Sequence, residues 1–213
     1  MNNIPKIIET LQLYQKNLRE PTIRRTSKTH KDPFRTLITC LLSLRTQDKN
    51  TEKASSNLFK VADTPEKIIK LPLKELEKLI YSSGYYKNKA KTIKHVSKVI
   101  LEKYNGEVPN DINKLMEIKG IGRKTATITM VFAFNNYNFI PTDVHVHVIS
   151  NRLGWVNEKT PEATELALMK VVPKQYWHLI NTLFVLHGQK ICLTRNPKCN
   201  ICPIEKNCPK IGL

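Results

Sequence analysis

Two glycines with one residue between them, Gly120 and Gly122, impose a tight turn on the middle of the chain. Apolar residues recur at helical spacing on both sides of this turn, over residues 112–116 and 126–132. This pattern predicts a helix, a hairpin and a second helix that begins near Arg123. The free N–H groups and the positive dipole end of the second helix would lie beside the glycine turn. Such a turn is suited to bind an anion, and a DNA phosphate is the first anion to consider.

Lys124 follows Arg123 in the first turn of the expected second helix. A cation there opposes the helix dipole, and Asp or Glu would be usual at this position. A local inconsistency of this kind indicates a functional residue. The positive surroundings would favour the neutral amine, which is the form that forms a Schiff base with a sugar carbon. The alternative is that both residues are basic groups that face a phosphate, and this stretch alone supports the two interpretations equally.

The charge of the chain favours a polyanionic partner. Lys and Arg total 35 against 18 Asp and Glu, which gives a formal net charge of +17 at pH 7. Nucleic acid is the first candidate partner and a membrane surface is the second. The N-terminal segment lacks a signal-peptide pattern, and no apolar run reaches the length of a membrane span. We therefore expect a cytoplasmic, nucleoid-associated protein without membrane insertion, whose cysteines do not form disulfides.

Helical periodicity covers most of the chain and predicts a mainly α-helical protein. We expect a first helix over residues 4–18, then a basic linker or DNA-facing loop over residues 19–32. Pro33 would open a nearly all-apolar, buried helix in which Cys40 is a small core residue. Residues 144–148 alternate with a period of two, and this pattern alone predicts a strand. Further helices are expected over residues 48–61, 65–69, 73–82, 89–104, 161–171 and 174–188.

Capping residues mark several of these helix ends. Asp48 or Thr51 is expected to cap the helix that begins near residue 48. Asn110 or Asp111 is expected to cap the first helix of the hairpin unit, and residues 105–106 (Asn-Gly) should end the helix before it.

Four of the five cysteines lie within the last 22 residues, with the spacing C-x6-C-x2-C-x5-C. Four thiolates at short spacing predict a metal centre, either a tetrahedral zinc ion or a cubane iron–sulfur cluster. The loop between the first two cysteines carries Arg195 and Lys198, which a bound metal would present rigidly to phosphates. A purely structural clip for the C-terminal tail is compatible with this role and does not exclude it, and redox catalysis is not expected. The predicted ligands are Cys192, Cys199, Cys202 and Cys208.

Together, the hairpin with its lysine (residues 118–126), Asp143 and the four-cysteine loop resemble the helix-hairpin-helix DNA glycosylases, and most closely the endonuclease III family. Residues 43–48 (Ser-Leu-Arg-Thr-Gln-Asp), 105–109 (Asn-Gly-Glu-Val-Pro) and 185–188 (Val-Leu-His-Gly) also resemble that family. The resemblance covers essentially the whole chain.

This resemblance implies an all-α fold with two lobes. Residues 26–137 would form a six-helix barrel lobe, with the helix-hairpin-helix motif at about residues 111–134. Residues 1–25 and 138–213 would together form the second lobe, which holds a 4Fe–4S cluster in the loop 192–208. Double-stranded DNA with a damaged base or an abasic site would lie across the cleft between the lobes, with the base flipped out. The family tendency is a monomer.

The implied activity is that of a base excision repair DNA glycosylase with AP lyase activity, which removes oxidised or damaged pyrimidines from duplex DNA. Lys124 would attack C1′ of the sugar to give a Schiff base, and the 3′ phosphate would leave by β-elimination. Asp143 would stabilise the charge that builds on the sugar and assist proton transfer. Its simpler role is to cap the helix that follows it. The resemblance also favours a helix over a strand at residues 144–148.

Several further residues are expected to contact DNA. Tyr85 would insert into the base stack, or it is an exposed loop residue or a cover of the core. Arg45 replaces the Gln that is frequent in the family, and it would fill the vacated gap or read the opposite base. Because Arg prefers guanine edges, the lesion and opposite-base preferences stay open. His145 and His147 are expected to orient or pack. The expected DNA contacts are Lys119, Gly120, Ile121, Gly122, Arg123, Arg45, Gln47, Tyr85, His145, Arg195 and Lys198.

Two other functions compete with this one. The first is a mismatch uracil or thymine glycosylase with the same fold. The second is a non-catalytic DNA-binding module, in which the hairpin and the metal loop are phosphate clamps. The presence of both Lys124 and Asp143 argues against the module, because binding alone requires neither.

Overall fold

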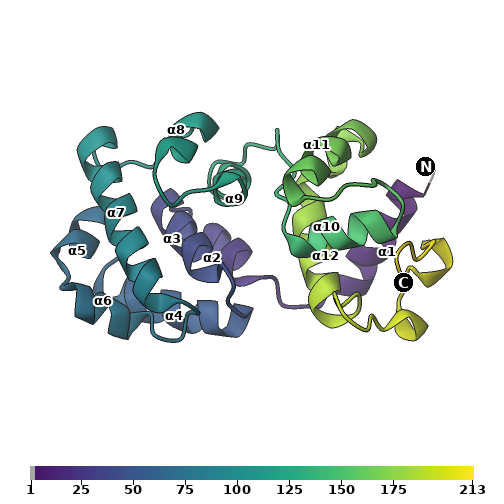
Figure 1. Cartoon of the computed structure of the whole chain (residues 1–213), viewed down its shortest axis with the longest axis horizontal. Helices are drawn as coiled ribbons and strands as arrows, with labels where there is room; N and C mark the ends of the chain where they lie inside the picture. The colour runs from purple at the N-terminus through teal and green to yellow at the C-terminus, as the bar shows by residue number, and fades with distance from the viewer. Residues whose placement is uncertain (1–2) are drawn as a thin grey trace. The chain divides into compact units, whose positions relative to one another are not determined.

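The computed structural model describes residues 3–213, and helices form all of its regular structure (Figure 1). No strand occurs among these residues, so the predicted all-α class is confirmed. None of the helices in this range is both long enough and apolar enough to cross a lipid bilayer. The helices are α1 (Ile4–Gln15), α2 (Thr22–His30), α3 (Pro33–Ser43), α4 (Asp48–Val61), α5 (Pro65–Lys70), α6 (Leu73–Leu79), α7 (Tyr86–Tyr104), α8 (Ile112–Glu117), α9 (Arg123–Ala133), α10 (Val144–Arg152), α11 (Pro161–Val171) and α12 (Trp177–Lys190), with 3-10 turns η1 (Lys174–Tyr176), η2 (Cys199–Ile201) and η3 (Glu205–Asn207).

The chain divides into two compact units. The continuous unit contains residues 22–136 and therefore helices α2 to α9. The discontinuous unit combines residues 3–21 with residues 137–213, so that α1 packs against α12 from the other end of the chain. Side chains of the N-terminal segment reach the C-terminal segment directly, because Gln15 Nε2 donates to Leu183 O at 3.0 Å.

Helix α3 is the centre of the continuous unit. Its side chains from Phe34 to Leu42 are buried except for Arg35, and Cys40 has no exposed surface. The helix begins where Asp32 accepts hydrogen bonds from two backbone N–H groups, with Pro33 in the first turn. It contacts α2, α4, α7 and α9. The predictions of a buried helix and a core cysteine are confirmed. Helix α3 also packs against α9, the second helix of the hairpin.

The loop expected over residues 19–32 is wrong, because its larger part forms α2. The segment is polar and basic, so it carries no apolar stripe that would have identified a helix. Contacts with α4 stabilise it instead. Thr22 N donates to Asp48 Oδ1 at 2.9 Å, and Arg25 pairs with Glu52 at 3.0 Å.

The expected cap of α4 is also wrong. Helix α4 begins at Asp48 itself, and its N-cap Gln47 makes no side-chain capping bond. Asp48 instead accepts the Thr22 N–H group at the first residue of α2, and Thr51 lies inside α4. By contrast, Asp111 caps α8 as expected, because its carboxylate accepts two backbone N–H groups.

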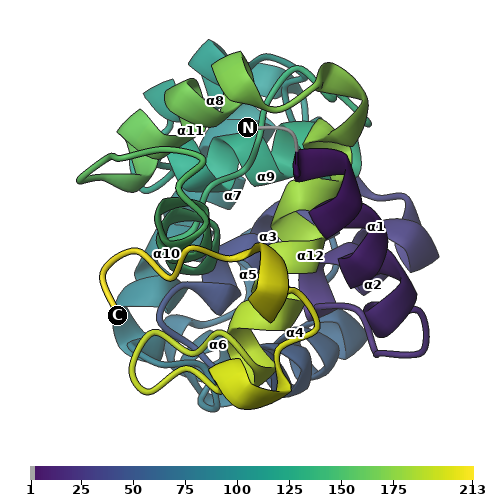
Figure 2. The same cartoon turned by 90° about the vertical axis from the view of Figure 1, so that its right-hand side faces the viewer.

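The discontinuous unit has its own apolar core. Ile7, Ile8 and Leu11 of α1 are fully buried in it, together with Ile180 and Phe184 of α12. Figure 2 shows the C-terminal loops, in yellow, beside α10 and α12.

Residues 144–148 belong to α10, so the helix implied by the resemblance is confirmed and the strand indicated by the alternation is wrong. Val146 and Ile149 point into the core at helical spacing. Burial of this face outweighs the β-propensity of the three valines.

Candidate nucleic-acid interface and cysteine site

The glycine turn between α8 and α9 has two different glycines. Gly120 has a φ of +102°, and a Cβ atom there would lie 2.6 Å from Thr92 Cγ2, so this position requires glycine. Gly122 has an ordinary φ, and a Cβ atom there would meet nothing within 4 Å. The first glycine shapes the turn and the second leaves open space beside the start of α9. The side chain of Ile121 is buried, so this residue can contact DNA only through its backbone. The side chain of Lys119 is exposed.

Lys124 is half-buried in the first turn of α9, as predicted. No acidic residue lies in this turn, and the N-cap Gly122 has no side chain to satisfy the first N–H groups. The positive charge of Lys124 acts on Cys40 of α3. Burial raises the pKa of the Cys40 thiol to about 11, and the charge of Lys124 opposes this rise.

Arg45 and Tyr85 come from different loops of the continuous unit, and the structure brings them together. The guanidinium carbon of Arg45 lies 5.8 Å from the centre of the Tyr85 ring. Both side chains are exposed, Tyr85 by 63%. Gln47, another expected DNA contact, is also exposed on the loop that carries Arg45.

Asp143 belongs to the discontinuous unit and is the N-cap of α10. Its Oδ1 accepts from the backbone N–H groups of His145 at 2.9 Å and Val146 at 3.0 Å, so the expected cap is confirmed. The His145 ring packs against Gly188 of α12, where a Cβ atom would lie only 2.4 Å from Nδ1. His147 makes a 2.8 Å hydrogen bond with Thr164 Oγ1, which is the packing role expected for it.

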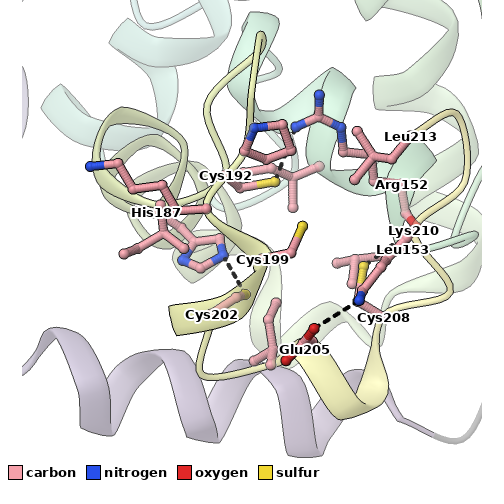
Figure 3. Close-up of a pocket in the computed structure, with 15 residues that line it drawn as sticks. Arg152, Leu153, His187, Cys192, Cys199, Cys202, Glu205, Cys208, Lys210 and Leu213 are labelled. Carbon is pink, nitrogen blue, oxygen red and sulfur yellow. Dashed lines mark hydrogen bonds and ion pairs between the residues drawn. The ribbon is translucent and has the colours of Figure 1, made fainter.

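The four C-terminal cysteines line one cavity, which Figure 3 shows with their side chains placed around it. All four are free and half-buried. The cavity has about 390 Å³ of empty space, including its part open to solvent. Within residues 3–213, no three His, Cys, Asp or Glu side chains lie so that they could hold one metal ion as they stand. The loop between the first two cysteines exposes Arg195 and Lys198.

The charge state of these thiols depends on what they bind. Burial raises the pKa of Cys202 to about 11, with a smaller contribution from the neighbouring cysteines, although a hydrogen bond from the backbone of Ile204 acts in the opposite direction. Burial also raises the pKa of Cys208. Such thiols become thiolates when a metal supplies positive charge. The donor set and its confinement in one cavity therefore fit a metal centre.

Two residues that hold the cysteine loop were not predicted. Arg152 is buried, and its guanidinium donates to Leu193 O at 2.8 Å, Thr194 O at 2.9 Å and Cys192 Sγ at 3.3 Å. His187 lies with Nε2 3.5 Å from Cys202 Sγ, and burial lowers the pKa of this imidazole to about 4. His187 is part of a segment that resembles the glycosylase family, whereas Arg152 carries no signal in the sequence.

Comparisons with known proteins agree with this fold. The model of the HhH-GPD superfamily of base excision DNA repair proteins matches residues 38–174. Endonuclease III of Thermotoga maritima is 45% identical over 188 residues, which cover 87% of this chain and 88% of that protein. This chain therefore belongs to the endonuclease III family within the HhH-GPD superfamily.

Solved structures give the same picture. A trapped covalent intermediate of endonuclease III with DNA matches with a TM-score of 0.85 and 32% identity, over 98% of this chain and 95% of that one. A thermostable thymine-DNA glycosylase matches with a TM-score of 0.81 and 25% identity, over 97% and 95% of the two chains.

Proposed function

We propose that this protein is a base excision repair DNA glycosylase that removes damaged pyrimidines and then cleaves the strand as an AP lyase. The observation that carries the proposal is Lys124, half-buried in the first turn of α9 directly after an exposed glycine turn. A covalent intermediate between a glycosylase and DNA requires a nucleophile on the protein. The Lys124 amine can supply it, and a related endonuclease III has been trapped in such an intermediate.

The chemistry follows from an amine at a sugar carbon. The neutral Lys124 amine attacks C1′, the bond from C1′ to the base breaks, and the base leaves with a proton. The attached amine loses a proton, and the bond from C1′ to the ring oxygen O4′ then breaks as O4′ takes up a proton. The opened sugar is left as a protonated Schiff base, which acidifies the hydrogen on C2′. Removal of that hydrogen expels the 3′ phosphate, and water then releases the lysine.

Asp143 is the carboxylate in this proposal. Departure of the base builds positive charge on the sugar, which a nearby carboxylate stabilises. Asp143 Oδ1 accepts hydrogen bonds from two backbone N–H groups, and these bonds hold the carboxylate in one orientation. The same residue thus serves as a helix cap and as the acidic group of the reaction.

The remaining contacts divide into phosphate binding and insertion. The N-terminus of α9 and the exposed Lys119 would bind a phosphate beside the open space at Gly122. Arg45 and Tyr85 would enter the base stack where the damaged base leaves it.

We further infer that the four cysteines hold a 4Fe–4S cluster. Support comes from the four thiols around one cavity and from the family to which the chain belongs. When bound, the cluster would tie the loop 192–208 together and keep Arg195 and Lys198 in place as phosphate contacts. Neither base removal nor elimination transfers electrons, so this role is structural.

The identity of the metal can be tested with cysteine variants. Purified protein should be brown and contain iron, and Cys199→Ser should lose both the colour and the iron. Cys40→Ala is the matched control, because this buried cysteine lies outside the cavity, and it should keep both. Stoichiometric zinc in a colourless protein would contradict the cluster.

Borohydride trapping tests the activity. Wild-type protein should form a covalent adduct with duplexes that contain thymine glycol or an abasic site, and Lys124→Ala should form neither. Lys114→Ala is the control, because Lys114 is an exposed lysine of the neighbouring helix α8, and it should form both adducts. An adduct with the abasic-site duplex alone would support the AP lyase activity but contradict thymine glycol as a substrate. Bound DNA without any adduct would refute the proposal.

The second candidate, a mismatch thymine glycosylase, is less supported than the first, because endonuclease III matches this chain with the higher identity and TM-score. The fold also matches the thermostable thymine-DNA glycosylase at 25% identity. Release of thymine from a G:T mismatch without a trapped adduct would support this candidate over the first.

A further inference from the structure

Two exposed residues of the continuous unit have an unusual backbone conformation. Arg45 has a φ of +50° and Tyr85 a φ of +57°, in the left-handed region that residues other than glycine seldom adopt. Such a conformation is unfavourable for residues other than glycine and persists only where the surroundings impose it. These are the two residues whose guanidinium carbon and ring centre lie 5.8 Å apart. Contacts from neighbouring residues must therefore hold both loops in this conformation.

Lys89 lies beneath both loops. It is 8% exposed, and its backbone N–H donates to Tyr85 O at 3.0 Å, one helical turn back. Its Nζ donates to Leu42 O at 2.7 Å and to Leu44 O at 2.5 Å, directly before Arg45. The same amine contacts the hydroxyls of Thr46 and Ser83, each at 2.8 Å, so that it bonds both loops at once.

The two loops also touch each other directly. The backbone N–H of Gly84 donates to Thr46 Oγ1 at 3.0 Å. A Cβ atom at residue 84 would lie 2.7 Å from Arg45 O, so only glycine allows this approach. The Thr46 hydroxyl therefore accepts hydrogen bonds from both the Lys89 amine and the backbone N–H of Gly84.

Burial of the Lys89 amine carries a free-energy cost, because the charged group loses its hydration. Its amine forms no ion pair with the residues that the structure describes, and all four oxygens around it are neutral. Burial lowers the pKa of this lysine to about 8, which records the cost of the charge. An apolar side chain of equal length would avoid the cost but would leave two backbone carbonyls without this donor.

We propose that Lys89 is a positioning residue, which locks the loops of Arg45 and Tyr85 into one rigid element that enters the base stack. This inference rests on the proposed function, because it assigns the element to base extrusion. Insertion between bases requires side chains that are already in place, since a displacement of 1 Å can cost about 100-fold in rate. Lys89 itself would touch neither the DNA nor the reacting atoms.

Lys89→Met tests the proposal in the full-length protein with its metal centre. Lys91→Met is the matched control, since Lys91 is an exposed lysine of the same helix. Lys89→Met should slow base removal from a thymine-glycol duplex at least about tenfold, whereas Lys91→Met should stay within about twofold. The second readout is 2-aminopurine fluorescence opposite a stable abasic-site analogue, which reports insertion without catalysis. Lys89→Met should give the signal of an Arg45→Ala/Tyr85→Ala variant.

A structural defect is separated from positioning by combining variants. If Lys89 acts through the element, Lys89→Met should change the rate of the Arg45→Ala/Tyr85→Ala variant by less than about twofold. Losses that multiply, or a Lys89→Met rate equal to that of Lys91→Met, would overturn the proposal.

Thr46→Val provides the same comparison if Lys89→Met does not fold, because it removes only the shared hydroxyl. It should reduce both rate and fluorescence response at least about threefold, and a loss that persists in the Arg45→Ala/Tyr85→Ala background would overturn the proposal. Failure of the proposed function is distinguishable: wild-type protein would then remove no base and form no adduct, while the fluorescence readout would still report whether Lys89 controls insertion.

Discussion

Asp143 can be tested for its two roles separately, because asparagine keeps one of them. Its Oδ1 accepts two backbone N–H groups at the start of α10. Asparagine offers a carbonyl oxygen in the same place and ranks with aspartate as an N-cap, whereas alanine offers none. Asp143→Asn therefore removes the charge alone, and Asp143→Ala removes both the charge and the cap.

The expected stability change follows from the cap. Loss of an N-cap side chain to alanine costs about 1 kcal/mol. The discontinuous unit, residues 3–21 and 137–213, is about the size of a 100-residue domain, for which about 1 kcal/mol lowers Tm by roughly 4–8 °C. Asp143→Ala should show this decrease by circular dichroism of the protein with its metal centre, and Asp143→Asn should stay within about 2 °C of wild type.

The expected activity change does not follow the cap. Both variants should lose single-turnover base removal by at least about 100-fold, which is the lower range for a group that assists proton transfer. Asp32→Asn is the control, because Asp32 caps α3 with the same two-bond geometry and has no proposed chemistry. If Asp143→Asn removes the base at the wild-type rate while Asp143→Ala does not, Asp143 is a helix cap and its catalytic role is refuted.

Three further outcomes are expected. Gly188→Ala should lower Tm, although alanine usually stabilises a helix interior by about 1 kcal/mol, because the new Cβ would overlap the His145 ring; in a His145→Ala background the same change should raise Tm, and equal effects in both backgrounds would contradict the packing. A hydrogen bond from Lys67 lowers the pKa of Asp63 below its ordinary 3.8. Its stabilisation is therefore present above about pH 4 and lost as the pH falls through the folded value, so Asp63→Asn should lower Tm at pH 7 and converge with wild type in acid. DNA affinity should fall steeply with salt, given the net charge of +17, and a flat response in a filter-binding titration would argue against phosphate contacts.

The features that sequence could predict depend on local pattern. Helix α3 is apolar on nearly every face, which indicated burial before any contact was known. Asp111 and Asp143 each precede a helix, and both act as caps through bonds to N–H groups two and three residues later. The four cysteines are close in sequence, so their convergence on one cavity followed from spacing.

The features that sequence could not predict depend on partners far along the chain. Helix α2 takes its first capping oxygen from Asp48, 26 residues later. Arg152 reaches backbone carbonyls about 40 residues away, and Lys89 reaches carbonyls about as far before it. Backbone carbonyls are present at every residue, so no pattern of side chains marks the ones that a buried cation will use.

The contact between α1 and α12 has a consequence for the order in which the protein matures during synthesis. Residues 22–136 are complete as a unit before any of residues 137–213 is made. Ile7 and Leu11 of α1 stay uncovered until α12 (Trp177–Lys190) has been made, and translation of the 115 intervening residues of the continuous unit alone takes roughly 6–23 s at about 5–20 residues per second. The half of the molecule that carries the four C-terminal cysteines therefore assembles last, and the apolar face of α1 stays uncovered until then.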